Sequence, residues 1–199
     1  MKKGWVQRID RTVAEPFIEQ WHYSHLVPTG RNIFFGWYTD EGLYAVADYG
    51  IGVNGYQAKY LAQQTGHDVG SLNLLELKRL ARAEPQQHDM PLTRFLKICH
   101  AILKKDGVRF IVAFSDPDHG HNGGLYKAAN FTHLGKTNAE RHVVDKCGRQ
   151  FHRRRIARYA ERHTVSPASA RRMLGLTMQK TSPKDRWFLA LNKFAEVVQ

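Results

Sequence analysis

The apolar positions of this chain follow two periods, one typical of strands and one of helices. Trp5 to Asp10 alternates like a first strand, and Val13 to Gln20 has helical spacing. Two apolar segments, Asn32 to Tyr38 and Leu43 to Tyr49, are joined by Thr39-Asp40-Glu41-Gly42, which is typical of a hairpin. The first part of the chain therefore predicts one helix beside antiparallel strands.

The middle of the chain alternates between the two periods. Leu72 to Leu80 resembles a strand, and Pro91 to Lys105 carries an apolar stripe at helical intervals. Val108 to Phe114 is a continuous apolar run too short for a buried helix, and Gly124 to Asn130 follows it with helical spacing. This order predicts an α/β fold with a mixed, largely antiparallel central sheet flanked by helices.

The last part of the chain combines a hairpin with two short helices. Ala139 to Val144 and Arg149 to Arg153 are predicted strands, and Arg154 to Arg162 is a predicted basic helix. Ser166-Pro167 starts a second helix that runs from Ala168 to Leu174. A late strand, Trp187 to Leu191, is expected to return to the sheet.

Length and composition bound the organisation of the chain. With 199 residues and 42% hydrophobic content, we expect a single domain over residues 1–199, in which 153–176 is a basic helical insertion before the last strand. The two cysteines, Cys99 and Cys147, suit a reducing cytoplasm. No apolar run approaches about 18 residues, and no secretion signal is evident, so we expect a cytoplasmic protein without a membrane partner. The oligomeric state stays open.

Charge points to a polyanionic partner. Thirty Lys and Arg against eighteen Asp and Glu give a net charge of +12 and place nucleic acid first, with a merely solubilising basic surface as the alternative. Guanidinium groups bind phosphates, and the predicted nucleic-acid-binding residues lie on the two late helices. They are Arg153, Arg154, Arg155, Arg158, Arg171 and Arg172. The loop between the helices lacks the glycine often found in helix-turn-helix turns, which argues against that motif.

The strand-to-helix crossing from Ser115 to Tyr126 concentrates acids, histidines, a hydroxyl and glycines. Ligands of open α/β sheets bind beyond the carboxyl ends of strands, so Ser115, Asp116, Asp118 and Tyr126 are candidate catalytic residues. Asp116 is preferred as a proton acceptor because it directly follows the strand. The alternative is a simple turn in which Asp118 caps the next helix.

Two further groups complete the candidate chemistry. His22 and Tyr23 follow the first helix, where Tyr23 could stack on an extruded base and His22 could carry a proton. An aromatic corner of the core explains them equally well. The amides of Gly123, Gly124 and Leu125 could bind an anionic group of a donor, although a tight turn needs no ligand.

Metal binding is an open alternative. His22 with His25, or His119 with His121, together with Asp116 or Asp118, could hold a non-haem iron. None of these spacings is diagnostic of a metal site, so the metal is left unknown.

The order of elements resembles the GNAT acyltransferase fold, and more specifically the Mom family of phage DNA-modification proteins. The matching residues occur in one order along the chain, from about Glu15 to Leu191. They are Trp21-His22-Tyr23-Ser24-His25, Gly36, Gly50-Ile51-Gly52, Leu77-Lys78-Arg79-Leu80, Ser115 to His121, Gly124 to Phe131, Gly135, Gly148 to His152, and Lys184-Asp185-Arg186-Trp187.

This resemblance implies an enzyme that converts the exocyclic amine of adenine in double-stranded DNA to a carbamoylmethyl-amine and so protects the DNA from restriction. It implies a small-molecule donor, acetyl-CoA or a related two-carbon compound, with Arg79 among the donor-binding residues, and a host-cell cytoplasm if the chain is phage-encoded. The glycine-rich pyrophosphate loop of GNAT enzymes is absent from Arg82 to Met90. An acyltransferase for a protein or small amine, and a non-catalytic DNA-binding protein, are the alternatives.

Overall fold

The computed structural model describes residues 4–51, 55–83, 90–139, 141–147, 150–151 and 153–191. The chain divides into two compact units. The main unit comprises Met1–Ser115, His121–Gly135 and Asp185–Gln199, and the basic unit comprises Asp116–Gly120 and Lys136–Lys184. The predicted insertion, 153–176, lies within the basic unit.

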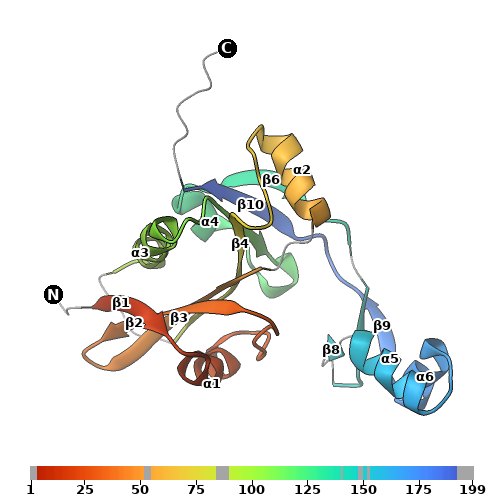
Figure 1. The fold of residues 1–199 in the computed structure, drawn as a ribbon. Helices are drawn as coiled ribbons and strands as arrows, with labels where there is room; N and C mark the ends of the chain where they lie inside the picture. The colour runs from red at the N-terminus through yellow and green to blue at the C-terminus, as the bar shows by residue number, and fades with distance from the viewer. Residues whose placement is uncertain are drawn as a thin grey trace. The chain divides into compact units, whose positions relative to one another are not determined.

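The main fold is built on a seven-stranded sheet with the order β1-β2-β3-β4-β5-β10-β6 (Figure 1). The strands are β1 (Trp5–Ile9), β2 (Asn32–Thr39), β3 (Gly42–Gly50), β4 (Leu74–Arg82), β5 (Phe110–Ser115), β6 (Thr132–Lys136) and β10 (Asp185–Ala190). β4 and β5 run parallel, whereas β1 to β4 and the pair β5 and β10 are antiparallel. The prediction of a mixed, largely antiparallel sheet is confirmed.

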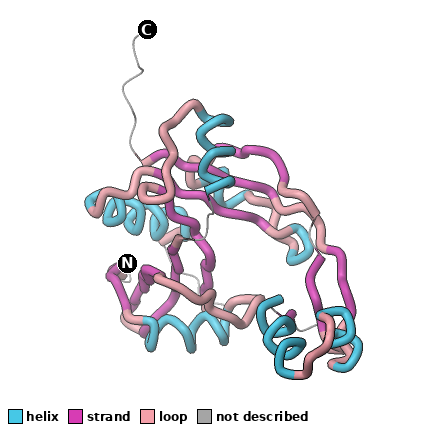
Figure 2. Tube along the Cα trace, turned by 45° about the vertical axis from the view of Figure 1, so that its right-hand side comes forward, coloured by secondary structure: helices cyan, strands magenta, loops and turns pink. Residues whose placement is uncertain are grey.

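Helices cover both faces of the sheet (Figure 2), which explains why β3 is buried along most of its length. Ala45, Ala47 and Tyr49 pack in the core that includes α3 (Leu92–Lys105), while Val46 packs with α1 (Arg11–Trp21). Because successive strand residues point to opposite faces, a strand enclosed between two helices is apolar at almost every position. One polar residue, Asp48, breaks this pattern.

Three further helical segments complete the middle of the chain. α2 (Gly55–Thr65) was not expected, because few of its described side chains are fully buried: Ala58 and Leu61 lie in the core, and Tyr60 and Ala62 pack against it. A short 3-10 helix, η1 (Pro117–His119), occupies the crossing, and α4 (Gly124–Ala128) follows it. The predicted loop from Ala81 to Met90 falls largely at 84–89, which lies outside the described residues, as does Gly52.

The basic unit occupies the connection between two neighbouring strands of the main sheet, β6 and β10. It contains a three-stranded sheet of β7 (Arg141–Val144), β8 (Gln150–Phe151) and β9 (Thr177–Lys180), with α5 (Arg153–Arg162) and α6 (Pro167–Met173). The predicted hairpin and both helices are present, although Gly148, Arg149 and His152 lie outside the described residues. β9 was not predicted, because all four of its residues are exposed and it lacks an apolar pattern.

The turn between α5 and α6 closes the end of α5 without a glycine. Thr164 adopts a left-handed backbone with φ of 51°, and the amide of Val165 donates to the carbonyl of Ala160 at 3.0 Å. This is the closing geometry that glycine usually supplies after a helix. The sequence argument against a helix-turn-helix therefore fails at this turn. The predicted cap of α6 is present, since Ser166 Oγ accepts from the amide of Ser169 at 3.1 Å.

Cys99 is buried, Cys147 is exposed, and both are unpaired. In the described part of the chain, no helix combines the length and the apolar character needed to cross a bilayer.

Candidate functional site

The sheet opens between its two parallel strands. Leu74–Leu77 of β4 pair with Phe110–Ala113 of β5, and the pairing stops there. β4 continues to Arg82 paired with β3, and β5 continues to Ser115 paired with β10. The carboxyl ends of the two strands therefore part, and backbone groups of β4 face the gap, which is where α/β sheets bind ligands.

Trp187 of β10 organises the edge beside this gap. Its Nε1 donates to Ser115 Oγ at 2.9 Å, and its ring lies 6.0 Å from the ring of Tyr126. A Cβ on Gly123 would come within 2.0 Å of the indole, and the φ of Gly123 is +75°. Gly123 is thus required by both its backbone conformation and the contact with Trp187. Ser115 is 1% exposed and serves as a hydrogen-bond partner of Trp187.

The His22–Tyr23 corner begins where α1 ends. His22 is buried, and its Nδ1 accepts from the amide of Ser24 at 3.1 Å and lies 2.8 Å from Ser24 Oγ. Because a backbone N–H can only donate, the neutral imidazole carries its proton on Nε2. The ring of Tyr23 lies 4.3 Å from that of His22, and Tyr23 is 39% exposed.

This corner lies beside the downstream part of the crossing. The ring of Tyr23 makes an edge-to-face contact with His121 at 5.2 Å. Burial raises the pKa of Tyr126 well above its ordinary value, and the neighbouring Tyr23 and Glu76 raise it further. Tyr126 therefore keeps its hydroxyl proton at physiological pH and is available as a donor. Two segments about 100 residues apart in sequence meet within the main unit.

Glu76 and His121 were not among the predicted site residues. Glu76 lies on β4, close enough to influence the pKa values of Tyr126 and Asp48. The available signal was a carboxylate placed between Leu75 and Leu77 in a predicted strand. His121 belongs to the crossing itself and gains significance only from its contact with Tyr23.

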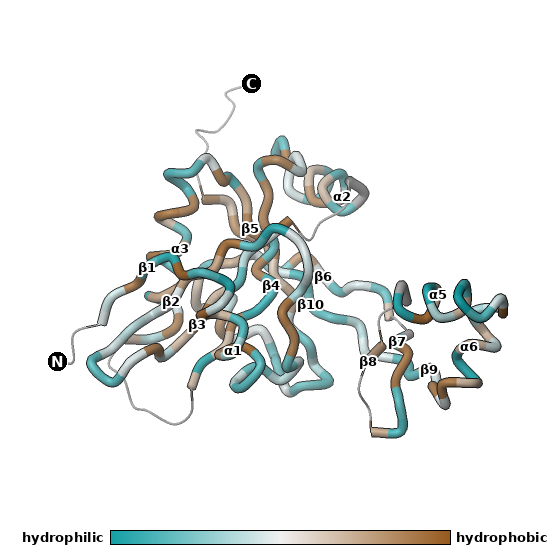
Figure 3. Tube along the Cα trace, turned by 60° about the horizontal axis from the view of Figure 1, so that its bottom comes forward, coloured by the Kyte–Doolittle hydropathy of each residue, from teal (hydrophilic) through white to brown (hydrophobic). Residues whose placement is uncertain are grey.

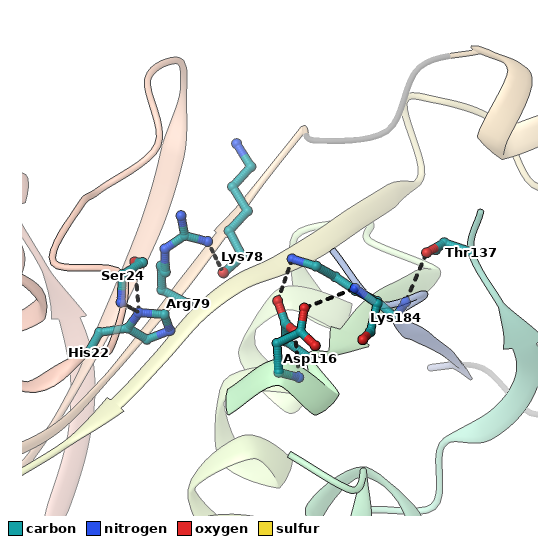
Figure 4. A network of polar contacts seen from close by, with 9 residues as sticks. His22, Ser24, Lys78, Arg79, Asp116, Thr137 and Lys184 are labelled. Carbon is teal, nitrogen blue, oxygen red and sulfur yellow. Dashed lines mark hydrogen bonds and ion pairs between the residues drawn. The ribbon is translucent and has the colours of Figure 1, made fainter. Parts of the chain in front are cut away.

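The two acids of the crossing belong to the basic unit and have partners there (Figure 4). Asp116 is 6% exposed, accepts from the amide of Asp118 at 3.1 Å, and lies 2.8 Å from Lys184 Nζ. Asp118 accepts from the amide of Ser182 at 2.9 Å, and this hydrogen bond lowers the pKa of Asp118. The amide of Thr137 donates to the carbonyl of Lys184, and the amide of Lys184 donates to Thr137 Oγ1. Asp116 and Asp118 thus tie the crossing to the chain as it returns to β10.

The residues predicted to bind the donor already have protein partners. The amide of Gly124 donates to Asn122 Oδ1 at 2.9 Å, so Asn122 caps α4, and Asp118 does not. Leu125 packs against the main core. Arg79 donates through Nε to the carbonyl of Leu26 at 3.1 Å and through Nη1 to that of Lys78 at 2.7 Å. Arg79 therefore anchors the segment that follows the His22–Tyr23 corner.

The histidines do not assemble an iron site. His25 Nδ1 lies 2.6 Å from the carbonyl of Glu19, and His119 and His121 fall in different units. Among the residues that the structure describes, no group of three or more His, Cys, Asp and Glu could hold a metal ion. The residues present do not fit iron.

Positive charge is concentrated in the basic unit. Residues 136–184 contain thirteen Lys and Arg against three Asp and Glu, which gives +10 of the total +12. Hydrophilic and hydrophobic positions both occur along α5 (Figure 3). Ile156 and Ala160 are buried on this helix, which also carries exposed arginines. The exposed arginines of this unit are Arg155, Arg158, Arg162 and Arg172, and Arg171 is half-buried. Arg153 and Arg154 are placed in α5, but their side chains lie outside the described part.

Comparison with solved structures defines the class of protein: the fold is that of the GNAT acyltransferases. The ribosomal-protein-S18-alanine N-acetyltransferase from Escherichia coli is 14% identical over 99% of each chain, with a TM-score of 0.54. FeeM, an N-acyl amino acid synthase from uncultured soil microbes, is 11% identical, covering 97% of this chain and 93% of its own, with a TM-score of 0.54. Spermidine/spermine N-acetyltransferase SpeG from Vibrio cholerae is 9% identical, covering 96% of this chain and 95% of its own, with a TM-score of 0.52.

The model of the Mom protein family matches residues 4–197, so the chain belongs to the Mom protein family. The predicted resemblance is confirmed at this level. No curated protein matches the chain.

Proposed function

We propose that this chain is a transferase that converts the exocyclic amine of adenine in double-stranded DNA to a carbamoylmethyl-amine, acting in the cytoplasm, the host cell's if the chain is phage-encoded. The match of the Mom family model over residues 4–197 carries the proposal. The charge of residues 136–184 supports a DNA partner, because a net +10 on so short a segment attracts a polyanion.

The chemistry requires a C–N bond to form between adenine N6 and the methylene carbon of a two-carbon donor. The leaving group departs with the electron pair of its bond, and N6 loses one proton. Adenine N6 is a weak nucleophile because its lone pair is delocalised, so the proton must be accepted as the bond forms. Asp116, which directly follows β5, is the proposed acceptor, and its Oδ2 lies 2.8 Å from Lys184 Nζ.

The remaining roles follow from protonation and exposure. Tyr126 keeps its proton because burial raises its pKa, so its neutral hydroxyl is proposed to donate a hydrogen bond to the leaving group. His22 presents Nε2–H and is suited to donate to an acceptor on the base or the donor. Tyr23 is the exposed member of the corner and offers an aromatic face for stacking an extruded base. Ser115 and Asp118 act by positioning, through Trp187 and Ser182.

The donor is a small two-carbon molecule that carries its leaving group on the methylene carbon. Acetyl-CoA, which the GNAT fold suggests, carries its leaving group on the carbonyl carbon and therefore fits the acyl transfer of the second candidate. The gap between β4 and β5 would receive the donor, with the backbone of β4 beyond Leu77 as the hydrogen-bonding edge. Arg79 and the amides of Gly123 and Leu125 border this region in the proposal. An N-acyltransferase for a small or protein amine is the second candidate, favoured by the N-acetyltransferases among the similar structures.

The basic unit is proposed to hold the duplex through phosphate contacts by Arg155, Arg158, Arg171 and Arg172, with Arg153 and Arg154 on the same unit. Extruding one base costs a few kcal/mol, which such contacts offset. Each phosphate contact contributes about 0.9 to the slope of log affinity against log salt.

The direct test is to express the chain in bacteria, digest the cellular DNA to nucleosides and compare masses with those from Tyr126→Phe and Asp116→Asn. An adenosine bearing the mass of a carbamoylmethyl group, present with the parent and depleted with both variants, supports the proposal. Unmodified nucleosides from well-expressed protein would refute it, and turnover of an acyl donor on small amines without DNA would favour the second candidate.

Duplex binding is tested separately by salt titration. Replacing Arg155, Arg158 and Arg172 with Gln should make the salt slope shallower by about 2.7, as three lost phosphate contacts require. The matched control replaces the exposed Lys97, Lys104 and Lys105 of α3 with Gln, which removes the same charge from the main unit. Equal slopes for the two triple variants would contradict binding through these arginines.

A further inference from the structure

A buried carboxylate lies beneath the segment that follows the His22–Tyr23 corner, and nothing in the proposed chemistry uses it. Asp48 of β3 is 0% exposed and pairs across the sheet with Phe34 of β2 and Arg79 of β4. Its Oδ2 accepts from Asn32 Nδ2 at 3.1 Å, whereas its Oδ1 is buried without a hydrogen-bond partner. Burying a carboxylate in this way is costly, so packing alone does not explain it.

Asn32 connects this carboxylate to the corner segment. Its Nδ2 donates to the carbonyl of Pro28 at 3.1 Å as well as to Asp48, and its Oδ1 accepts from Lys78 Nζ at 3.2 Å. Turning the amide over would place its oxygen against two other oxygens. Asp48 therefore fixes the orientation of Asn32, and Asn32 in turn holds the backbone at Pro28.

Other side chains from the same neighbourhood hold the same segment. Arg11 Nη2 also donates to the carbonyl of Pro28, at 3.1 Å. Arg79 Nε donates to the carbonyl of Leu26, which also accepts from Ser24 Oγ at 3.3 Å. The amide of Ser24 donates to His22 Nδ1. Hydrogen bonds thus hold the segment at Pro28 and at Leu26, and Ser24 connects Leu26 to the imidazole.

Two motifs that the proposed chemistry leaves unexplained belong to this network. Lys78 and Arg79 come from Leu77-Lys78-Arg79-Leu80, and Gly50 begins Gly50-Ile51-Gly52. A Cβ on Gly50 would lie 2.6 Å from Lys78 Nζ and 2.9 Å from Asn32 Oδ1. The glycine therefore leaves room for the contact between Lys78 and Asn32.

We propose that Asp48 is a positioning residue, which acts through Asn32 and the Pro28 carbonyl to hold the segment that orients His22 and Tyr23. The catalytic part of this inference rests on the proposed function, whereas the conformational part stands on the network alone. An ionised Asp48 makes a charge-assisted hydrogen bond to Asn32, which is about twice as strong as one between neutral groups.

The strength of this anchor depends on pH near neutrality. Burial raises the pKa of Asp48 to about 7, opposed by the cations Lys78, Arg79 and Arg11 and assisted by Glu76. These are the charged groups that β4 and α1 turn toward it. Above about pH 7 Asp48 is ionised and its hydrogen bond to Asn32 is charge-assisted, at the cost of burying the charge; below this pH the hydrogen bond joins two neutral groups.

The test compares Asp48→Asn with Asp40→Asn, an exposed carboxylate in the turn between β2 and β3. Amide hydrogen exchange at pH 8 should become about tenfold faster in residues 22–31 of Asp48→Asn, whereas exchange in α3 should not become faster. The Asp40 variant should match the parent in both segments. Asn32→Ala breaks the same link with Asp48 intact, and it should raise exchange in the same segment. Unchanged exchange in 22–31 for both variants would overturn the proposal.

Activity provides the second readout. For Asp48→Asn we expect kcat for adenine modification to fall about tenfold, KM for the duplex to stay constant, and the rise in activity between pH 6 and pH 8 to be lost. An unchanged rate and pH profile in an active protein would overturn the positioning role and leave the proposed function intact. If the parent modifies no adenine, the proposed function fails, and hydrogen exchange still decides the role of Asp48.

Discussion

The contact between Gly123 and Trp187 gives the sharpest stability prediction. In Gly123→Ala the new Cβ would lie 2.0 Å from the indole and the residue would keep a φ of +75°. A left-handed backbone costs an alanine about 1–2 kcal/mol. Moving the indole also breaks its hydrogen bond to the buried Ser115 Oγ, which costs a further 1–3 kcal/mol or so. The sum is a destabilisation of about 2–5 kcal/mol.

Gly135→Ala is the matched control for this prediction. Gly135 has a φ of +78°, and a Cβ there would meet nothing within 4 Å. This variant should lose only the cost of a left-handed backbone for alanine, about 1–2 kcal/mol of the free energy of unfolding. The free energy of unfolding of both variants is measured by urea denaturation followed by circular dichroism. Equal losses in the two variants would refute the close contact between Gly123 and Trp187.

Two further predictions concern Asp48 and the turn of the basic unit. Asp48 has a folded pKa of about 7 against an ordinary value of 3.8, so its ionisation favours the unfolded chain as pH rises from 4 to 7. The free energy of unfolding of Asp48→Asn should therefore equal that of the parent near pH 4 and exceed it by up to about 4 kcal/mol above pH 7. Thermal unfolding at several pH values measures the difference, and a difference that is constant with pH would contradict the prediction. Thr164→Gly should stabilise the basic unit by about 0.5–1 kcal/mol, because glycine adopts the left-handed φ of 51° without strain. Hydrogen exchange of the α5 and α6 amides measures this gain in stability, and faster exchange in the variant would contradict it.

Local patterns predicted most of the fold, because each element is short and its apolar period is unambiguous. The hairpin of β2 and β3, the buried strand β5 and the cap at Ser166 all depend on residues within a few positions of one another. α2 was missed because, among its described residues, Ala58 and Leu61 are fully buried and the other side chains give no clear apolar stripe. The insertion of β10 between β5 and β6 depends on pairings between residues about 70 apart, which no local pattern specifies.

The sequence predicted candidate site residues, but it did not predict the partners that the structure gives them. The sequence singled out Tyr126 and the His22–Tyr23 corner by residue type, and the structure brings Tyr23 against His121. The partners of Asp116 and Ser115 come from Lys184 and Trp187, near the far end of the chain. A sequence pattern identifies a reactive side chain. Whether that side chain is already hydrogen-bonded or ion-paired depends on a residue far away in the sequence.

The crossing after β5 shows why the motif is dense in functional residue types. Its acids bond to Lys184 and Ser182 within the basic unit, while its glycine and tyrosine pack with Trp187 within the main unit. One short segment therefore serves both compact units. In Lys184-Asp185-Arg186-Trp187, the first residue belongs to the basic unit and the other three to the main unit. The proposed DNA-holding unit and the proposed reaction site are thus joined through two short motifs, and changes there should affect duplex binding and turnover together.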